Sequence, residues 1–168
     1  MHKERCLVVG LGNIGMGFDF KLSNQNVILS HCSAINEHDD FLLSGAVDPN
    51  TKLRADFENR YKSPAFSNID DALKSLNPTI GIICSPTEHH HSTLITLLQS
   101  PDLKAILCEK PLSYDFDEAK EMVNICADKG ISLYVNYMRR SDPNVIEIKR
   151  RIDCGEISQP IKINAWYS

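Results

Sequence analysis

The sequence predicts an α/β fold with a doubly wound parallel sheet, and three observations lead to that prediction. Short, nearly continuous apolar runs alternate with helical patterns along the chain. Runs of this kind are typical of parallel strands that are covered on both faces. A glycine-rich turn follows the first run directly. Because right-handed crossovers place helices on both faces of such a sheet, we expect a layered domain.

Composition excludes several other classes of protein. The 168 residues are 42% hydrophobic and 24% charged, with a net charge of −4, as in an ordinary globular domain. Acidic and basic residues are mixed, so we expect no nucleic-acid partner. No apolar run approaches the roughly 20 residues that cross a bilayer, and the first run is too short for a signal peptide, so we expect no membrane partner.

The cysteine pattern indicates reduced thiols. Six cysteines are present, and no two of them form a CxxC pair. Cys6, Cys84 and Cys108 fall inside apolar runs, where a free cysteine behaves as a small buried hydrophobe. We therefore expect neither a disulfide framework nor a metal site, and a cytoplasmic location.

The expected strands follow one another along the chain. Residues 6–10 form the first apolar run, which ends in glycine, and residues 41–47 form the second, which ends at Asp48. Three further runs have the same character: residues 79–84, 104–108 and 131–135. A short strand near residues 64–66 fills a position at one edge of the sheet.

Helical patterns occupy the intervals between these runs. Residues 115–129 carry apolar side chains on one stripe and end at Gly130. Asp115 with Glu118 three residues later resembles a capping box. Residues 50–61 and 87–99 are the other expected crossover helices.

The pattern changes after Tyr137, and we place a domain boundary there, with residues 1–137 and 138–168 on its two sides. Asp142 before Pro143 predicts the start of a helix that ends near Gly155. Residues 161–167 alternate as a half-buried strand does. We interpret this helix and strand as the beginning of an incomplete α+β second domain.

The motif Gly10-Leu11-Gly12-Asn13-Ile14-Gly15 follows the first predicted strand directly. In this position the first glycine permits a tight turn and the second lets backbone N–H groups approach a pyrophosphate. The third lets the helix pack closely on the strand. The motif predicts a Rossmann-type fold that binds a dinucleotide here; a glycine turn without a ligand is the alternative.

An acidic residue, Asp48, ends the second predicted strand. A carboxylate there accepts hydrogen bonds from ribose hydroxyls and repels a 2′-phosphate, which favours NAD over NADP. The alternative is a simple turn residue before Pro49. Asp48 lies 33 residues after Gly15, whereas about 20 is usual. The extra residues, 17–30, are expected to form a loop near the phosphate turn.

Four motifs at the ends of successive strands together resemble one family. They are Gly10 to Gly15, Asp48, Cys84-Ser85-Pro86-Thr87-Glu88-His89-His90 and Glu109-Lys110-Pro111. This set resembles the Gfo/Idh/MocA oxidoreductases, the relatives of glucose–fructose oxidoreductase and inositol dehydrogenase, over residues 5 to about 140. The Glu-Lys-Pro triplet is its most specific element. Members of that family are about twice as long as this chain.

The resemblance implies roles for individual residues. Those expected against the cofactor are Gly10, Gly12, Asn13, Ile14, Gly15, Asp48, Ser85, Pro86, His90, Glu109 and Lys110. Lys110 is expected near the nicotinamide and the substrate hydroxyl, with His90 bordering the nicotinamide, and these two are the expected catalytic residues. Asn136 and Arg139 lie in the segment that leads into the substrate domain, and with Lys110 they are expected to contact substrate.

The chemistry of the residues agrees with Lys110 as the central one, because it stands at the carboxyl end of a strand, where a lysine can assist proton transfer. A surface lysine paired with Glu109 is the alternative. The run His89-His90-His91 invites a metal site, but consecutive helical positions point about 100° apart and cannot converge on one ion. Arg139 and Arg140 can clamp an anionic group or simply begin the next helix in solvent.

Two functions follow from these observations. The first is an NAD(P)-dependent oxidoreductase that transfers hydride between nicotinamide and a hydroxyl or keto carbon of a sugar, cyclitol or related small molecule. We expect this protein to be a homo-oligomer or to need a missing C-terminal half. The second is a truncated dinucleotide-binding module without catalytic activity of its own.

Overall fold

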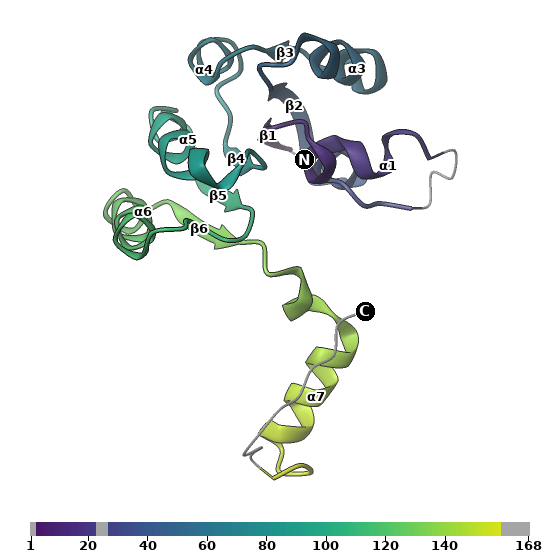
Figure 1. Cartoon of the computed structure of the whole chain (residues 1–168), viewed down its shortest axis with the longest axis vertical. Helices are drawn as coiled ribbons and strands as arrows, with labels where there is room; N and C mark the ends of the chain where they lie inside the picture. Colours follow the sequence, from purple (N-terminus) through teal and green to yellow (C-terminus); the bar gives the residue numbers. More distant parts are fainter. Residues whose placement is uncertain (1–2, 23–26, 159–168) are drawn as a thin grey trace. The chain divides into compact units, whose positions relative to one another are not determined.

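The computed structural model of the chain describes residues 3–22 and 27–158 (Figure 1). The chain divides into two compact units, Met1–Asn136 and Tyr137–Ser168, and each is described by itself.

The first unit is built on a six-stranded sheet. Its strands are β1 (Glu4–Val9), β2 (Phe41–Val47), β3 (Ala65–Phe66), β4 (Ile80–Ile83), β5 (Ala105–Cys108) and β6 (Ser132–Val135). All five pairings are parallel and the order is β3-β2-β1-β4-β5-β6. This is the order of a Rossmann fold. The predicted fold class, and the edge position of the short strand near residues 64–66, are confirmed.

Helices cover both faces of the sheet. They are α1 (Phe18–Phe20), α2 (His31–Glu37), α3 (Thr51–Tyr61), α4 (Ile69–Leu76), α5 (His90–Leu97) and α6 (Phe116–Asp128). In Figure 1, α4, α5 and α6 lie on one side of the strands, and α1 and α3 lie on the other. A hydrophobic core lies on each face of the sheet, and successive side chains of β1 point into opposite cores. Leu7 packs in the core with α5 and α6, and Val8 packs in the core with α2 and α3.

Several helices differ from their predicted form. Helix α4 was not anticipated, although Asn68 caps it by accepting a hydrogen bond from Asp71 N. The expected helix 87–99 begins with a 3-10 turn, η2 (Thr87–His89), before α5. Only half of the expected capping box forms. Asp115 accepts from Glu118 N at 2.9 Å, but the Glu118 carboxylate bonds the Ser113 hydroxyl instead.

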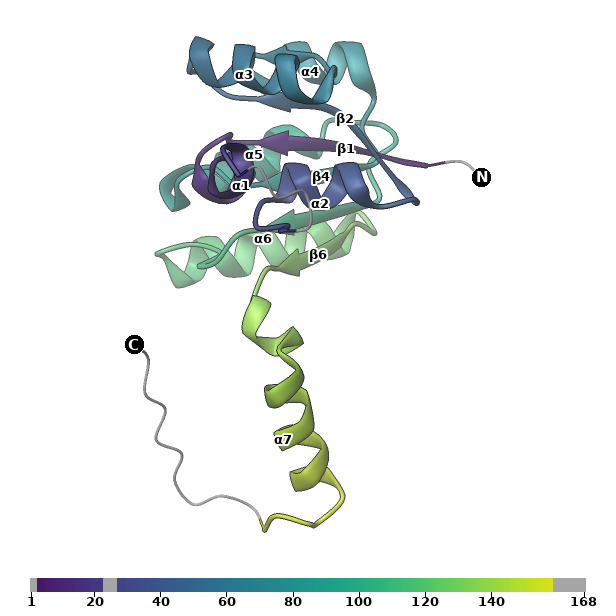
Figure 2. The same cartoon turned by 90° about the vertical axis from the view of Figure 1, so that its right-hand side faces the viewer.

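Hydrogen bonds connect the two ends of the extra segment after the glycine turn. The buried Asp19 carboxylate accepts hydrogen bonds from Leu29 N (2.7 Å), Ser30 N (2.9 Å) and Ser30 Oγ (2.7 Å). Arg60 of α3 donates to the carbonyl oxygen of Phe20 at 2.9 Å. Ser30 is in turn the N-cap of α2. These hydrogen bonds therefore connect α1 with the start of α2; both helices are labelled in Figure 2.

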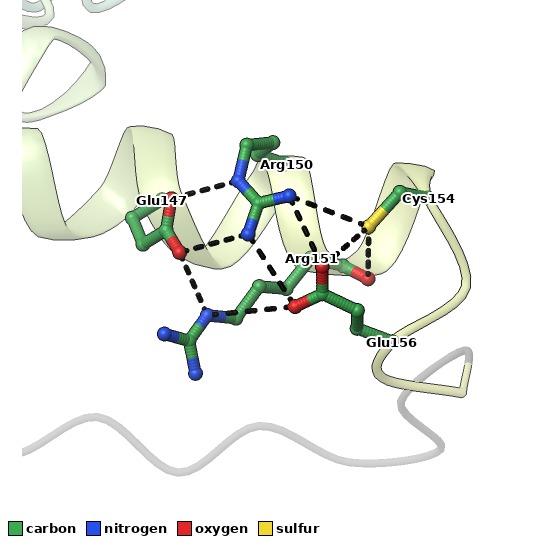
Figure 3. A network of polar contacts seen from close by, with 5 residues as sticks. All are labelled: Glu147, Arg150, Arg151, Cys154 and Glu156. Carbon is green, nitrogen blue, oxygen red and sulfur yellow. Dashed lines mark hydrogen bonds and ion pairs between the residues drawn. The ribbon is translucent and has the colours of Figure 1, made fainter.

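The second unit contains a 3-10 turn, η3 (Met138–Ser141), and α7 (Pro143–Asp153). As predicted, Asp142 caps α7, accepting from Asn144 N at 2.8 Å, and Pro143 is its first residue. Figure 3 shows Arg150 bonded to both Glu147 and Glu156 on the surface of α7. The expected strand at residues 161–167 lies outside the described residues. Among the helices described, none is long and apolar enough to cross a membrane.

Candidate functional site

The predicted site residues follow strands whose carboxyl ends lie side by side. Strands β1 and β4 are paired in the sheet, yet the next strands along the chain lie on opposite sides of them. Ligands of open α/β sheets bind outside the carboxyl ends of the strands at this kind of switch point. Gly10 follows β1 and Ser85 follows β4, and the two meet there.

Two of the three glycines are required by the fold itself. A Cβ atom on Gly10 would lie 2.7 Å from the backbone of Cys84 and Ser85, and the φ angle of Gly10 is +99°. A Cβ atom on Gly15 would lie 2.0 Å from the carbonyl oxygen of Gly10. These glycines let β1, β4 and the first helical turn approach closely, so no other residue fits at either position.

The middle glycine has a different environment. A Cβ atom on Gly12 would meet no atom of the described residues within 4 Å. Gly12 is the N-cap of a one-turn π-helix, η1 (Asn13–Gly17). The first N–H groups of a helix have no intrahelical acceptor, so those of Asn13 and Ile14 are available to an anion. Open space beside Gly12 and these donors fit a pyrophosphate.

The Asp48 carboxylate is positioned by two backbone donors. Oδ2 accepts from Leu11 N at 2.8 Å and Oδ1 accepts from Asn50 N at 2.8 Å. A carboxylate offers about four lone-pair sites, so two remain for ribose hydroxyls. The two interpretations of Asp48 are compatible, since the side chain orders the turn and still has acceptor capacity. The residue is only 8% exposed.

Ser85 supplies an unsatisfied polar atom at the same edge. Its Oγ is buried and has no hydrogen-bond partner in the part of the chain that the structure describes. A buried hydroxyl without a partner costs free energy unless a ligand or water satisfies it. This orphaned donor, beside Gly10, is the second indication that the edge fits a polar ligand. Pro86 follows on the exposed surface.

The Glu109-Lys110-Pro111 segment follows β5, and its peptide bond between Lys110 and Pro111 is cis. Glu109 Oε1 accepts from His31 Nε2 at 2.8 Å and from Asn136 Nδ2 at 2.6 Å. Burial raises the pKa of the Glu109 carboxyl, but these two hydrogen bonds and the charge of His31 outweigh it, so the net pKa is lowered. Glu109 is therefore held as a carboxylate.

Lys110 is exposed. Within the described residues its ammonium makes no ion pair, because the neighbouring Glu109 carboxylate pairs with His31. The alternative of a surface lysine paired with Glu109 is not what the structure forms. Lys110 thus keeps a free cationic head at the carboxyl edge of the sheet.

His90 departs from its predicted part in the site. It is 1% exposed. Its Nε2 lies 2.9 Å from Ser85 O, and its Nδ1 lies 3.0 Å from Pro111 O and 3.2 Å from Leu112 O. Both ring nitrogens lie within hydrogen-bond distance of backbone carbonyl oxygens, which they face in place of a nicotinamide or substrate. His90 instead links the turn after β4 to the turn after β5.

The other histidines of the run do not join it. His89 is exposed, and His91 pairs with Glu121 of α6 at 3.3 Å. Within residues 3–22 and 27–158 no group of metal-binding side chains forms a metal site. All six cysteines are free, and five are buried. Burial raises the pKa of the Cys6 and Cys108 thiols to about 12, with the nearby carboxylates Glu4 and Glu109 adding to the rise.

Of the three residues expected to contact substrate, Lys110 and Asn136 belong to the first unit and Arg139 to the second. Asn136 ends the first unit and holds Glu109. Arg139 belongs to η3 of the second unit. The residue that sequence reasoning missed is His31, because its partner Glu109 is 78 residues away. The one local signal was Ser30, a good N-cap residue directly before His31.

A parallel sheet in this order, with a glycine turn and an acidic strand end at its switch point, defines a dinucleotide-binding domain. Comparison with known sequences agrees. Residues 4–137 match the family described as "Oxidoreductase family, NAD-binding Rossmann fold". The chain therefore belongs to the Gfo/Idh/MocA oxidoreductase family, and the predicted family and cofactor class are confirmed.

Two curated relatives are similar over different lengths. The scyllo-inositol 2-dehydrogenase (NAD(+)) of Bacillus subtilis is 32% identical over 162 residues, which are 95% of this chain and 43% of the relative. The inositol 2-dehydrogenase of Mycolicibacterium smegmatis is 34% identical over 105 residues, 60% of this chain and 30% of the relative. The chain thus spans less than half the length of these relatives.

Solved structures show the same fold. The WlbA dehydrogenase from Bordetella pertussis, in complex with NADH and UDP-GlcNAcA, superposes with a TM-score of 0.77 at 24% identity, covering 92% of this chain and 40% of that one. The myo-inositol 2-dehydrogenase from Lactobacillus plantarum gives 0.75 at 24% identity, covering 94% and 43%.

Proposed function

We propose that this chain binds NAD(H) and serves an oxidoreductase that moves hydride between the nicotinamide and a hydroxyl or keto carbon of a sugar, cyclitol or related small molecule. The observation that carries the proposal is the meeting, at one sheet edge, of the open space beside Gly12, the acceptor capacity of Asp48 and the unpaired ammonium of Lys110. The named activities of the relatives support the substrate class.

Each part of the edge has a task in this proposal. The N–H groups of Asn13 and Ile14 hold the pyrophosphate, and Asp48 accepts from the adenosine ribose. Because the Asp48 carboxylate would repel a 2′-phosphate, NAD is preferred to NADP. When bound, the nicotinamide supplies the hydride acceptor or donor. Lys110 Nζ lies against the reacting oxygen of the substrate: its ammonium gives a proton to a keto oxygen on reduction, and its neutral amine takes the hydroxyl proton on oxidation.

Further features belong to the whole protein and remain proposals. Arg139 contacts substrate, and the protein acts as a homo-oligomer or with additional chain. The free, mostly buried cysteines support a cytoplasmic location, where thiols stay reduced. The domain boundary after residue 137 belongs to the same proposal.

Calorimetric titration with NAD⁺, NADH and NADP⁺ in parallel tests the binding step. We expect NAD(H) to bind and NADP⁺ to bind more weakly, and Asp48→Asn to reduce that difference. The exposed Asp39→Asn is the matched control and should bind as the parent chain does. Absence of binding by every dinucleotide would contradict the proposal.

Turnover is tested separately with polyols and NAD⁺. We expect Lys110→Ala to abolish oxidation while leaving ADP-ribose binding largely intact, and turnover close to the unaltered protein would contradict the role of Lys110. Dinucleotide binding without oxidation of any polyol by the chain would favour the alternative, a binding module without activity of its own.

A further inference from the structure

A histidine from a distant part of the chain holds the carboxylate beside Lys110. His31 is the first residue of α2, and Glu109 directly follows β5. The His31 Nε2–H donates to Glu109 Oε1 over 2.8 Å, and the two side chains are only 13% and 12% exposed. At this burial the contact is screened weakly by solvent, so it constrains the carboxylate more than a surface pair does.

The remaining contacts fix the direction of the carboxylate. Asn136 donates to the same oxygen, Oε1, at 2.6 Å. The second oxygen, Oε2, lies 3.4 Å from the backbone nitrogen of Lys110. Glu109 therefore bonds one side chain from α2, one from the chain beyond β6, and the backbone of Lys110, and leaves the Lys110 ammonium unpaired. The other titratable groups near this carboxylate are the buried thiols of Cys84 and Cys108.

The position of His31 depends on the extra residues after the glycine turn. Ser30, which caps α2, donates its hydroxyl to the buried Asp19 carboxylate at 2.7 Å. Asp19 also accepts from the backbone of Leu29 and Ser30. These hydrogen bonds to Asp19 fix Ser30 and therefore the position at which α2 begins. Because His31 is the next residue, they also determine where its imidazole lies.

We infer that His31 is a positioning residue, which holds Glu109 so that the Lys110 ammonium stays unpaired and correctly placed at the nicotinamide end of the site. The catalytic consequence of this inference rests on the proposed function. Without His31, the carboxylate keeps a single side-chain donor and is free to rotate toward the neighbouring ammonium. The site then loses the unpaired Lys110 ammonium, which dinucleotide binding alone does not require.

The first measurement needs no dinucleotide. The rate at which an amine-reactive acetylating reagent labels Lys110 is followed by mass spectrometry. We expect His31→Ala to slow the labelling several-fold, because the released carboxylate pairs with the ammonium. His31→Gln, whose amide can donate as Nε2 does, should label at the parent rate. The double variant His31→Ala with Glu109→Gln should recover the parent rate, because the anion is gone.

The second measurement compares NADH with ADP-ribose, which lacks the nicotinamide. We expect His31→Ala to weaken NADH binding about tenfold, because an ammonium paired with Glu109 no longer donates to the nicotinamide and one hydrogen bond from a charged group is of this order. ADP-ribose binding should weaken less than twofold. His31→Gln should keep NADH binding within about threefold. His89→Ala, an exposed histidine without a described side-chain contact, is the matched control.

The outcomes separate the two ideas. Parent-like labelling of Lys110 in His31→Ala overturns the inference. Equal weakening of NADH and ADP-ribose also overturns it, since that pattern indicates a general structural role. If the parent chain binds neither ligand, the proposed function fails, while the labelling series still decides whether His31 controls Lys110.

Discussion

The glycine turn and the Glu-Lys-Pro loop lie at the same edge of the sheet but are held there by different means. The turn is held by close backbone packing, with Gly15 against the carbonyl oxygen of Gly10 and Gly10 against Ser85. The loop is held by side chains that arrive from elsewhere: His31 and Asn136 on Glu109, and His90 on Pro111. The turn has no spare volume at Gly10 and Gly15, and the loop depends on hydrogen bonds that can be replaced.

This difference has a consequence for substitution. A closely packed backbone turn is destabilised by the addition of a single carbon atom, because the surrounding backbone cannot move aside. A structure held by several side-chain hydrogen bonds loses one contact at a time, at about 1 to 3 kcal/mol for each buried group left unsatisfied. We therefore expect larger effects from small changes in the turn than from larger changes in the loop.

The largest effect is expected for Gly15→Ala. The new Cβ atom would lie 2.0 Å from Gly10 O, and relief requires movement of the backbone. We expect a loss of about 3 kcal/mol or more in the free energy of unfolding. Urea denaturation followed by circular dichroism measures it.

Gly12→Ala is the matched control for the turn, since in the described part of the chain nothing lies within 4 Å of its Cβ atom. We expect its stability to stay within about 0.5 kcal/mol of the parent, while the methyl group takes the space proposed for the pyrophosphate and weakens NADH binding. Equal stabilities for the two variants would show that volume does not hold the turn.

The second effect concerns Asp19, in the segment that connects the two regions. Asp19 is 2% exposed and accepts three hydrogen bonds. We expect Asp19→Asn to cost about 2 to 3 kcal/mol at pH 7, because the amide presents hydrogens to groups that already donate. The exposed Asp39→Asn is the control and should cost little.

The pH dependence follows from the same carboxylate. Burial raises the pKa of Asp19, but the hydrogen bonds from Ser30 and Leu29 outweigh it, so the pKa is below its ordinary 3.8. A lowered folded-state pKa means that this stabilisation is complete above about pH 4 and is lost as pH falls through the folded value. The stability gap between parent and Asp19→Asn should therefore narrow from pH 5 to pH 2. A gap independent of pH would contradict this account.

The contrast between turn and loop also explains what the sequence could predict. Continuous apolar runs determine the buried strands, and the spacing of Gly10, Gly12 and Gly15 follows from close contacts within a few residues. Both patterns are local in the sequence, so both could be predicted from it. The pairing of His31 with Glu109 spans 78 residues and has no local pattern. His90 looked like a site residue because its motif lies at the right edge, and only its three carbonyl contacts place it inside the fold.

The smallest of the three effects is expected for His90→Gln. The imidazole spans two turns, with Nε2 at 2.9 Å from Ser85 O and Nδ1 at 3.0 Å from Pro111 O, whereas the single nitrogen of a glutamine amide cannot lie against the carbonyl oxygens of both turns. We expect a loss of about 1 to 2 kcal/mol in the free energy of unfolding. Hydrogen exchange should rise at residues 110–113 but not at the glycine turn, and His89→Gln should change neither. If exchange rose equally in both regions, the turn would depend on the loop, and the two parts of the site would not be held independently.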